Sequence, residues 1–282
     1  MKRLGLPAFL LAPALGLLAL LGYALGLIFR FSLHRYEPGS LALGGLTGEN
    51  YRRILDPLYL GSVWETLQIC VWVTLWSTLL GYPVAYALVR HSRRWVRSAI
   101  LGLTVLPFFL GIVVRSYAWT LVFGRQGFLA ALLGWTHLRT TPPQLLYTRA
   151  GVILALVQIS VPIMVILVAA GLAHQRRDLE RTAAVLGASP VRVFWHVTLP
   201  LSRPGIVSGC LVVFGWTLSS FATPVMIGGG RVYVMSVMIY DQILGAGNYP
   251  FGAALGLFVL VVDLALLWML TRLANRLRGA PA

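Results

Sequence analysis

The amino-acid sequence predicts an all-α fold, a polytopic transmembrane bundle of six helices. Two observations carry this prediction. Apolar types make up 58% of the 282 residues, charged types only 11%, and the mean hydropathy is +0.81. A soluble domain typically has about 25% charged residues, so this chain has too few to cover a water-soluble globule of its size. The second observation is a series of apolar runs that reach the roughly 20 residues a spanning helix needs.

The six predicted spans follow one another along the whole chain. The first contains no charged residue and is longer than the apolar region of a secretory signal, which is about 7–15 residues, so we expect a retained helix. The second contains Glu65 near its start, the third Arg115 and the sixth Asp263. The spans cover residues 4–29, 62–89, 98–123, 150–173, 204–227 and 251–271.

The basic residues predict the orientation of these spans. Six spans bring both termini to the same side of the membrane. The two termini and the loops on their side hold 14 of the 23 Lys and Arg residues, the loops 30–61, 124–149 and 228–250 hold 8, and Arg115 lies within a span. Cytoplasmic segments carry the excess of Lys and Arg, so we expect both termini in the cytoplasm.

Several classes of function are excluded. The only lysine is Lys2, so the chain has no P-loop, whose Lys must reach the phosphates of the nucleotide. The histidines show no paired metal-ligand spacing, no G-x-S-x-G motif occurs, and Cys70 and Cys210 lie inside apolar runs. The net charge of +15 lies mostly in short segments between spans rather than in a nucleic-acid-binding patch. We expect no enzyme, no bound metal or cofactor and no nucleic-acid partner.

The loop 174–203 is the most informative segment. Asp178 can cap a helix whose apolar positions are Leu179, Ala183 and Leu186, spaced four and three residues apart. Gly187 should then end this helix at the C′ position.

A second short helix should follow in the same loop. Ser189 is suited to its N-cap and Pro190 to its first position, and it should stop before Pro200. Two short helices joined by Gly187-Ala188-Ser189 predict a compact protrusion rather than a flexible linker.

This loop resembles the signature loop of type-1 ABC transporter permeases. The family pattern is Glu-Ala-Ala, three residues, Gly, nine residues, Ile, one residue and Leu-Pro. We align Ala183-Ala184 with the alanine pair, which puts Thr182 at the Glu position and leaves Glu180 nearby on a different helical face. Nine residues, 188–196, separate Gly187 from Val197, which replaces Ile, and Leu199-Pro200 closes the pattern.

Two further stretches look like spermidine/putrescine permeases. The first comprises Leu106-Pro107-Phe108-Phe109, Val114-Arg115-Ser116-Tyr117-Ala118-Trp119 and Gly124-Arg125-Gln126-Gly127; the second comprises residues 223–231 and 248–254. The resemblance covers essentially the whole chain. It implies a permease subunit that carries a polyamine or a related small cation; an opine, an aminophosphonate, thiamine or an amino-acid-like cation is the alternative solute.

The resemblance also implies partners and a location. Two permease subunits, identical or different, would form the pathway in the bacterial inner membrane. A cytoplasmic ATPase dimer would bind ATP and Mg²⁺, and a periplasmic binding protein would deliver the solute. Residues 1–61 would be the first helix and a periplasmic loop, 62–271 the type-1 permease domain with its cytoplasmic coupling loop 174–203, and 272–282 a cytoplasmic tail.

Within the loop, the resemblance assigns ATPase coupling to a set of ten residues. Leu179, Ala183 and Leu186 would sit in a groove of the ATPase, while Gly187 allows the turn and a close approach. The set is Asp178, Leu179, Glu180, Thr182, Ala183, Ala184, Leu186, Gly187, Leu199 and Pro200. The alternative is an amphipathic loop that lies on the membrane surface with its arginines near anionic lipids.

Ionisable and aromatic residues in the spans are candidates for the solute pathway, because charges inside a membrane are usually functional. Asp241 next to Tyr240 could hold an amine by charge and by cation–π attraction. A structural ion pair is the main alternative for Arg115, an interfacial position for Glu65, and packing for the aromatics. The candidates are Glu65, Arg115, Tyr117, Trp119, Trp216, Tyr240, Asp241 and Asp263.

Two rival interpretations stay open at this point. A stand-alone secondary transporter would be expected to show inverted repeats and ion ligands at the middle of the membrane, and neither is recognisable here. A membrane scaffold with no transport role is the other rival.

Overall fold

The computed structural model describes residues 5–38, 44–125, 127–135, 144–173 and 177–279. Side chains are described for a narrower set, 13–38, 44–125, 127–131, 144–173 and 179–272. These residues form helices, and the only β-type pairing among them is an isolated bridge between His34 and Leu46. The first residue of the predicted first span, part of the loop 124–149 and residues 174–176 lie outside this described part.

Five described helices are long and apolar enough to cross a membrane: Pro13–Ser32, Pro57–Arg90, Arg149–Ala173, Pro190–Leu218 and Tyr249–Arg272. They correspond to five of the six predicted spans. Some helices are longer than the spans predicted for them. The helix α3 covers Pro57–Arg90, against the predicted 62–89, and α13 covers Tyr249–Gly279, against the predicted 251–271. An amphipathic or charged helix end can project past the hydrocarbon core, which hydropathy alone cannot show.

The remaining predicted span, 98–123, is broken. It consists of α4 (Arg94–Val105), the 3-10 turn η1 (Leu106–Phe109) and α5 (Ile112–Phe123), and the chain bends by 101° between Arg94–Phe109 and Ile112–Ala131. Pro107 lies in the 3-10 turn, and Leu110 and Gly111 then adopt non-helical conformations, with ψ of 123° and 144°. Proline has no N–H to donate, so the helical ladder is interrupted at this point. The predicted span therefore corresponds to two helices that meet at a sharp bend.

The described chain divides into two compact units. Unit 2 contains residues 63–234 and 263–282, and unit 1 contains residues 1–62 and 235–262. The predicted permease domain 62–271 is therefore distributed over both units.

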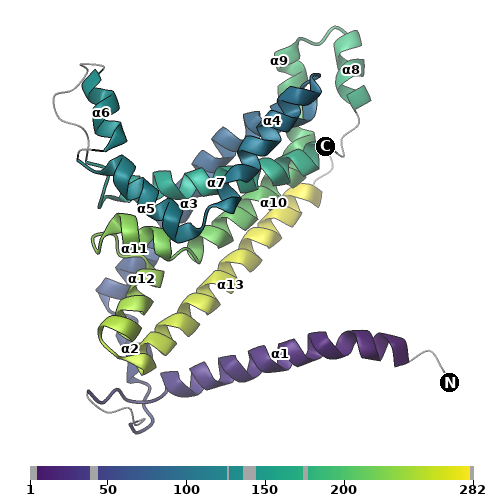
Figure 1. The fold of residues 1–282 in the computed structure, drawn as a ribbon. Helices are drawn as coiled ribbons and strands as arrows, with labels where there is room; N and C mark the ends of the chain where they lie inside the picture. The colour runs from purple at the N-terminus through teal and green to yellow at the C-terminus, as the bar shows by residue number, and fades with distance from the viewer. Residues whose placement is uncertain (1–4, 39–43, 126, 136–143, 174–176, 280–282) are drawn as a thin grey trace. The chain divides into compact units, whose positions relative to one another are not determined.

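Unit 2 is organised around α7 (Arg149–Ala173), which contacts α4, α5, α10 (Leu199–Leu218) and α11 (Ala222–Gly228) (Figure 1). Its spanning segment is 61% buried, the highest share among the five long helices. Small residues let α7 and α10 approach closely: a Cβ on Gly205 would lie 3.2 Å from the Cα of Gly171. Close backbone contact at small residues is typical of helix packing in membranes.

The predicted fifth span, 204–227, differs at both ends. Its helical path starts at Pro190 and the α10 helix ends at Leu218. The short helix α11 then follows after Ser219, Ser220 and Phe221, so the segment up to residue 228 is not one helix. Beside α10, the side chains of Cys70, Phe214 and Leu218 form a buried cluster with Leu266 and Leu270 of α13.

Unit 1 contains α1 (Gly5–Ser32), α2 (Glu49–Arg53), α12 (Met235–Tyr240), the π-helical turn η3 (Asp241–Gly245) and the first part of α13. The loops predicted at 30–61 and 228–250 therefore contain short helices. Asn50 organises the first loop, since its side-chain amide donates to the carbonyls of Ser32 and His34 at 2.8 and 2.9 Å. Phe251 is fully buried between Tyr59, at a ring-centroid distance of 5.0 Å, and the guanidinium of Arg53, at 4.6 Å.

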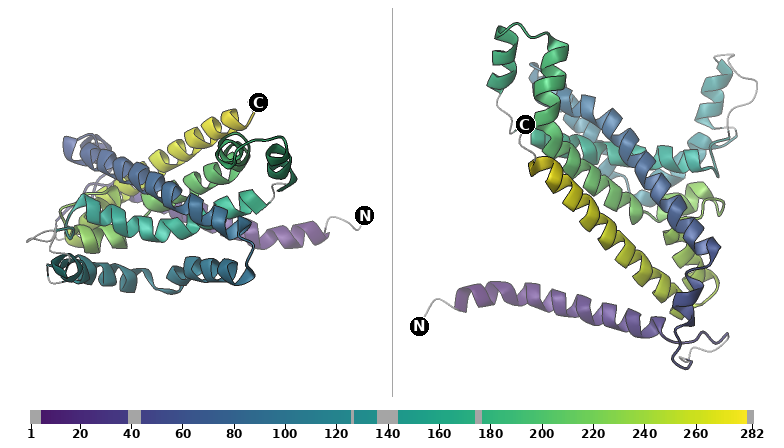
Figure 2. Two further views of the ribbon diagram at one scale, coloured as in Figure 1. Left: turned by 90° about the horizontal axis from the view of Figure 1, so that it is seen from above. Right: turned by 180° about the vertical axis from the view of Figure 1, so that it is seen from behind.

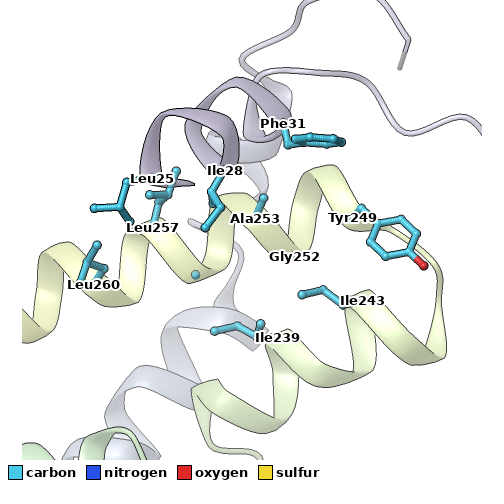
Figure 3. A pocket seen from close by; sticks show the side chains of 11 residues that line it. Leu25, Ile28, Phe31, Ile239, Ile243, Tyr249, Gly252, Ala253, Leu257 and Leu260 are labelled. Carbon is cyan, nitrogen blue, oxygen red and sulfur yellow. The ribbon is translucent and has the colours of Figure 1, made fainter. Parts of the chain in front are cut away.

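A groove of about 550 Å³ lies within unit 1 (Figure 3). Side chains of α1, α12, η3 and α13 point into it, and nearly all are aliphatic. The lining residues are Leu25, Ile28, Phe31, Ile239, Ile243, Tyr249, Gly252, Ala253, Gly256, Leu257 and Leu260. Because the lining offers no charged side chain, this groove does not qualify as a site for a charged solute.

Candidate coupling and solute-pathway sites

The first helix of the predicted coupling loop is α8 (Arg177–Val185). It forms a hairpin with α9 (Pro190–Val193), and this hairpin projects from one end of the unit 2 helices (Figures 1 and 2). Gly187 follows α8 with φ of +85°, in the left-handed region that favours glycine. Its N–H donates to the carbonyl of Ala184 at 3.0 Å, and the N–H of Ala188 donates to Ala183 at 3.1 Å. This pair of bonds is a Schellman motif, so the predicted C′ role of Gly187 is confirmed.

The second helix begins as predicted at α9 (Pro190–Val193). The side-chain oxygen of Ser189 accepts from the N–H of Arg192 at 3.4 Å, and Pro190 occupies the first turn. The helix does not end before Pro200, however. It continues through the π-helical turn η2 (Phe194–Thr198) into α10, with Pro200 in the first turn of α10. Pro200 has no N–H to donate, and a π-helical turn, in which the N–H of Leu199 donates to the carbonyl of Phe194, directly precedes it in the helix.

Two assignments in α8 need correction. The helix begins at Arg177, so Asp178 lies inside its first turn rather than in the capping position before it; the side chain of Asp178 is outside the described part. Only Val185 and Leu186 separate Ala184 from Gly187, whereas the family pattern requires three residues. The pattern therefore aligns Thr182-Ala183 with the alanine pair and places Arg181, not Thr182, at the Glu position.

The α8–α9 hairpin exposes apolar side chains. Leu179 is 49% exposed, Leu186 81% and Val185 88%, while Ala183 is half-buried and Ala184 and Thr182 are exposed. Val191 of α9 is also exposed, at 67%. Sequence reasoning missed Val185 and Val191 as members of this surface, although their apolar character in an otherwise polar loop was visible. We call Leu179, Val185, Leu186 and Val191 the hairpin surface.

Glu180 points away from this surface. Its carboxylate accepts hydrogen bonds from Arg90 Nη2 at 2.7 Å and from Thr198 Oγ1 at 2.9 Å. Thr198 is 1% exposed, and the next two residues, Leu199 and Pro200, are half-buried at the start of α10. The coupling set predicted from sequence thus contains both exposed and inward-facing members.

Arg115 is buried in α5, with 8% of its surface exposed. Its guanidinium donates one hydrogen bond, at 3.5 Å, to the carbonyl of Pro107 on the other side of the broken span. Among the described residues no carboxylate lies within ion-pairing distance of it. The structural ion pair expected as the main alternative is therefore absent from the described part.

Glu65 forms an ion pair with Arg149. Both carboxylate oxygens accept from the guanidinium of Arg149, which also donates to Gln68 Oε1 at 2.6 Å. These contacts join α3 to the start of α7 near one end of both helices. The pairing supplies a structural role for Glu65, since its charge is already neutralised.

The aromatic candidates of unit 2 differ in environment. Trp119 lies in α5, where its indole N–H donates to Gln158 Oε1 of α7 at 3.5 Å and its ring packs 4.7 Å from that of Phe123. Tyr117 and Trp216 are 58% and 47% exposed. Asp263 is half-buried on α13.

Sequence reasoning missed a polar contact between α5 and α11 and the polar side chain that faces Trp119. The buried hydroxyl groups of Ser116 and Thr223 lie 3.1 Å apart. Gln158 was a visible signal, because it is the one amide side chain in the predicted span 150–173.

Tyr240 and Asp241 belong to unit 1, where they are consecutive residues of α12 and η3. Both are exposed. Neighbours at i and i+1 on a helix do not face each other, and the joint amine site suggested by their adjacency in the sequence stays a prediction. The structure therefore distributes the pathway candidates over α3, α5, α10, α12, η3 and α13.

Both the sequence and the fold have known relatives. Residues 77–279 match the family described as "Binding-protein-dependent transport system inner membrane component". The chain is 33% identical over 233 residues to the spermidine/putrescine transport system permease protein PotB of Escherichia coli strain K12, covering 82% of this chain and 84% of PotB. It is 34% identical over 197 residues to the molybdenum transport system permease protein ModB of Mycobacterium bovis, covering 70% and 72%.

A solved structure shares the fold. A chain of the bacterial alginate ABC transporter, in complex with an alginate pentasaccharide-bound periplasmic protein, superimposes with a TM-score of 0.80 at 18% identity over 98% of this chain and 96% of that chain.

The matched residues include the C-terminal part of α3, the broken span, the Gly187 hairpin and α13. The predicted all-α transmembrane fold is confirmed, and the two rivals, a secondary transporter and a membrane scaffold, are set aside. The protein belongs to the binding-protein-dependent transport system inner membrane component family, and it is a multi-pass, non-enzymatic permease subunit of an ABC importer.

Proposed function

We propose that this permease subunit forms the pathway of a polyamine importer and that its hairpin surface docks onto a cytoplasmic ATPase. The observation that carries the docking proposal is the exposure of Leu179, Val185 and Leu186 on a hairpin whose turn is set by Gly187. Exposed apolar side chains on a rigid projection fit the helix-in-groove mode of recognition. A surface helix resting on lipid would not need the Schellman turn that holds α8 and α9 in a hairpin.

Three kinds of partner complete the proposed assembly. A second permease subunit completes the pathway, two ATPase subunits bind ATP and Mg²⁺, and a periplasmic binding protein delivers the solute. The alginate transporter of similar fold was solved with a solute-bound periplasmic protein, which supports the last component. When the ATPase pair closes, the docked hairpins move as rigid bodies and the spans open outward.

The solute class rests on the relatives. The 33% identity to PotB extends over 84% of that protein, and its name specifies spermidine and putrescine. The similarity to ModB, named for molybdenum, makes an oxyanion the competing solute. We retain Arg115, Tyr117, Trp119, Trp216, Tyr240, Asp241 and Asp263 as pathway candidates, and we assign Glu65 to the ion pair with Arg149.

A substitution on the hairpin surface tests the docking. Leu186→Asp should reduce the ATPase retained on the purified permease about tenfold or more, because burying a Leu side chain contributes about 1.5–3 kcal/mol and a factor of ten corresponds to 1.4 kcal/mol. Leu186 is 81% exposed, so the permease itself should fold normally. The measurement is co-purification of the co-expressed ATPase in detergent.

Leu46 supplies a matched control, since it is 77% exposed and belongs to unit 1. Leu46→Asp should retain the ATPase at the wild-type level. Undiminished retention by Leu186→Asp would place the docking surface elsewhere.

Uptake measurements test the solute class. Liposomes that contain the complete complex and its binding protein should accumulate labelled spermidine, and excess putrescine should compete while molybdate should not. Accumulation of molybdate instead of spermidine would overturn the polyamine assignment and leave the docking proposal standing.

A further inference from the structure

The α8–α9 hairpin is joined to α3 and to the start of α10 at a single carboxylate. One oxygen of Glu180 accepts both hydrogen bonds, from Arg90 at the end of α3 and from Thr198 at the start of α10. The side chains of Glu180 and Arg90 are only 19% and 11% exposed. Glu180 and Arg90 are 90 residues apart in the sequence, so this contact is created by the fold.

The two sides of α8 carry different chemistry. Val185 and Leu186 are among the most exposed apolar residues of the chain, whereas Glu180 turns inward. Glu180 is thus unavailable to an ATPase that approaches the hairpin surface. A partly buried ion pair within the permease, rather than a carboxylate offered to a partner, is the arrangement that the distances describe.

A second set of contacts joins the same helices. The ring of Phe194 in η2 packs edge-on against Tyr82 and Tyr86 of α3, with centroid distances of 5.8 and 6.2 Å. The hydroxyl of Tyr82 lies 3.1 Å from that of Ser202 in α10. Aromatic edge-to-face contacts and a buried hydroxyl pair favour one relative position of α3 and the start of α10.

We propose that Glu180 is a positioning residue that links α8 to both α3 and α10, so that a displacement of the hairpin moves the neighbouring ends of these two spans together. This inference rests on the proposed docking of an ATPase on the hairpin surface. Without the carboxylate, Arg90 would keep a largely buried charge with no anion beside it, and the contact would open. Force applied to α8 would then reach α10 through the chain alone and would no longer reach α3 directly.

The test measures coupling in the complete complex, reconstituted with its partner permease, ATPase and binding protein. Glu180→Gln removes the charge and keeps the size and the acceptor oxygen. We expect wild-type retention of the ATPase and continued ATP hydrolysis, but at least a fivefold drop in labelled spermidine transported per ATP hydrolysed. Arg90→Gln should give the same result, because it removes the same ion pair from the other side.

Two further variants address folding defects. The double charge exchange Glu180→Arg with Arg90→Glu should recover at least half of the wild-type transport ratio, which is the amount of spermidine transported per ATP hydrolysed. Thr198→Val is nearly isosteric and removes only the second hydrogen bond, so it should give an intermediate ratio.

Glu49→Gln is the matched control. Glu49 pairs with Arg35 at 3.5 Å, but the side chains of Glu49 and Arg35 are 66% and 67% exposed. Removing this exposed pair should leave the ratio unchanged.

The outcomes separate this inference from the docking proposal. An unchanged transport ratio in Glu180→Gln, or no recovery in the double exchange, overturns the positioning role. Loss of the ATPase from Glu180→Gln as severe as from Leu186→Asp also overturns it, because Glu180 would then belong to the docking surface. Failure of the docking proposal is instead recognised by full ATPase retention in Leu186→Asp.

Discussion

Arg115 shows at the scale of one residue how a charge can be held inside a membrane span with no carboxylate beside it among the described side chains. Its guanidinium reaches back across the break to the carbonyl of Pro107, in the 3-10 turn Leu106–Phe109 that closes the first half of the span, and this carbonyl also accepts from the N–H of Leu110. The carbonyl end of a helix carries partial negative charge, which attracts a cation. At 3.5 Å this hydrogen bond is near the limit of useful geometry, so the Arg115 side chain is weakly satisfied for a buried cation.

This weak satisfaction leads to a prediction for Arg115→Met. We expect the melting temperature of the purified protein to stay constant or rise, because replacing a poorly compensated buried charge with an apolar side chain removes a desolvation cost. We expect solute uptake to fall about tenfold, since a costly buried charge is retained for function. The measurements are thermal unfolding in detergent and uptake in liposomes, with Arg115→Lys as the charge-retaining control. A loss of about 3 °C or more in melting temperature, roughly 1 kcal/mol for a chain of this size, would show a structural role instead.

At the scale of elements, the contact between α7 and α10 depends on two glycines. A Cβ at Gly205 would lie 3.2 Å from both the Cα of Gly171 and the carbonyl oxygen of Leu167, and 3.3 Å from the Cα of Val168. All three neighbours are backbone atoms, which cannot move aside as a flexible side chain would. The two helices can therefore keep their close approach only with glycine at this position.

The same substitution at two positions of α10 tests this packing. Gly205→Ala should destabilise the protein by about 1–3 kcal/mol, because overpacking forces the helices apart. Gly215→Ala should be neutral or stabilising by up to about 1 kcal/mol, since its Cβ would meet only Leu267 at 3.6 Å and alanine is the better helix former. The measurement is the melting temperature of each variant, Gly205→Ala and Gly215→Ala, in the same detergent. Equal melting temperatures would mean that α7 and α10 are not held by this contact.

At the scale of the whole molecule, the broken span decides the topology. Five continuous helices alone would place the termini on opposite sides of a membrane, whereas a sixth crossing by Arg94–Phe109 and Ile112–Ala131 returns them to one side. The excess of Lys and Arg in the terminal segments and loops on their side favours the second arrangement. We propose that the broken pair crosses and that both termini are cytoplasmic.

Reporter fusions test this topology. A phosphatase that is active only in the periplasm should be inactive when fused after Ala282 and active when fused after Gly124, while a fluorescent protein that folds only in the cytoplasm should show the reverse. A fusion after Arg97 should match that after Ala282 and serves as the control. Periplasmic activity after Ala282 would mean that the broken pair re-enters on the same side.

Local chemistry predicted several features correctly. The turn at Gly187 depends on a residue that tolerates a left-handed backbone conformation and on hydrogen bonds between neighbouring backbone groups, so the sequence alone predicted it. The Ser189-Pro190 helix start and five of the spans were predicted in the same way. Pro107 marked an interruption of the hydrogen-bond ladder, but the 101° bend at this point and the continuation of the helix through Pro200 were not predictable in this way. A proline in an apolar run can break a helix, or be carried in its first turn, and neighbouring segments decide which occurs.

By itself, the sequence determined that this protein crosses a membrane several times and that a hairpin of two short helices turns at Gly187. These properties depend on composition and on residues a few positions apart. Only the tertiary structure decided that Glu180 faces Arg90 and Thr198, that Glu65 is neutralised by Arg149, and that Arg115 donates to the carbonyl of Pro107. Such partners lie up to 90 residues away along the chain, and which charges meet is settled when the helices pack.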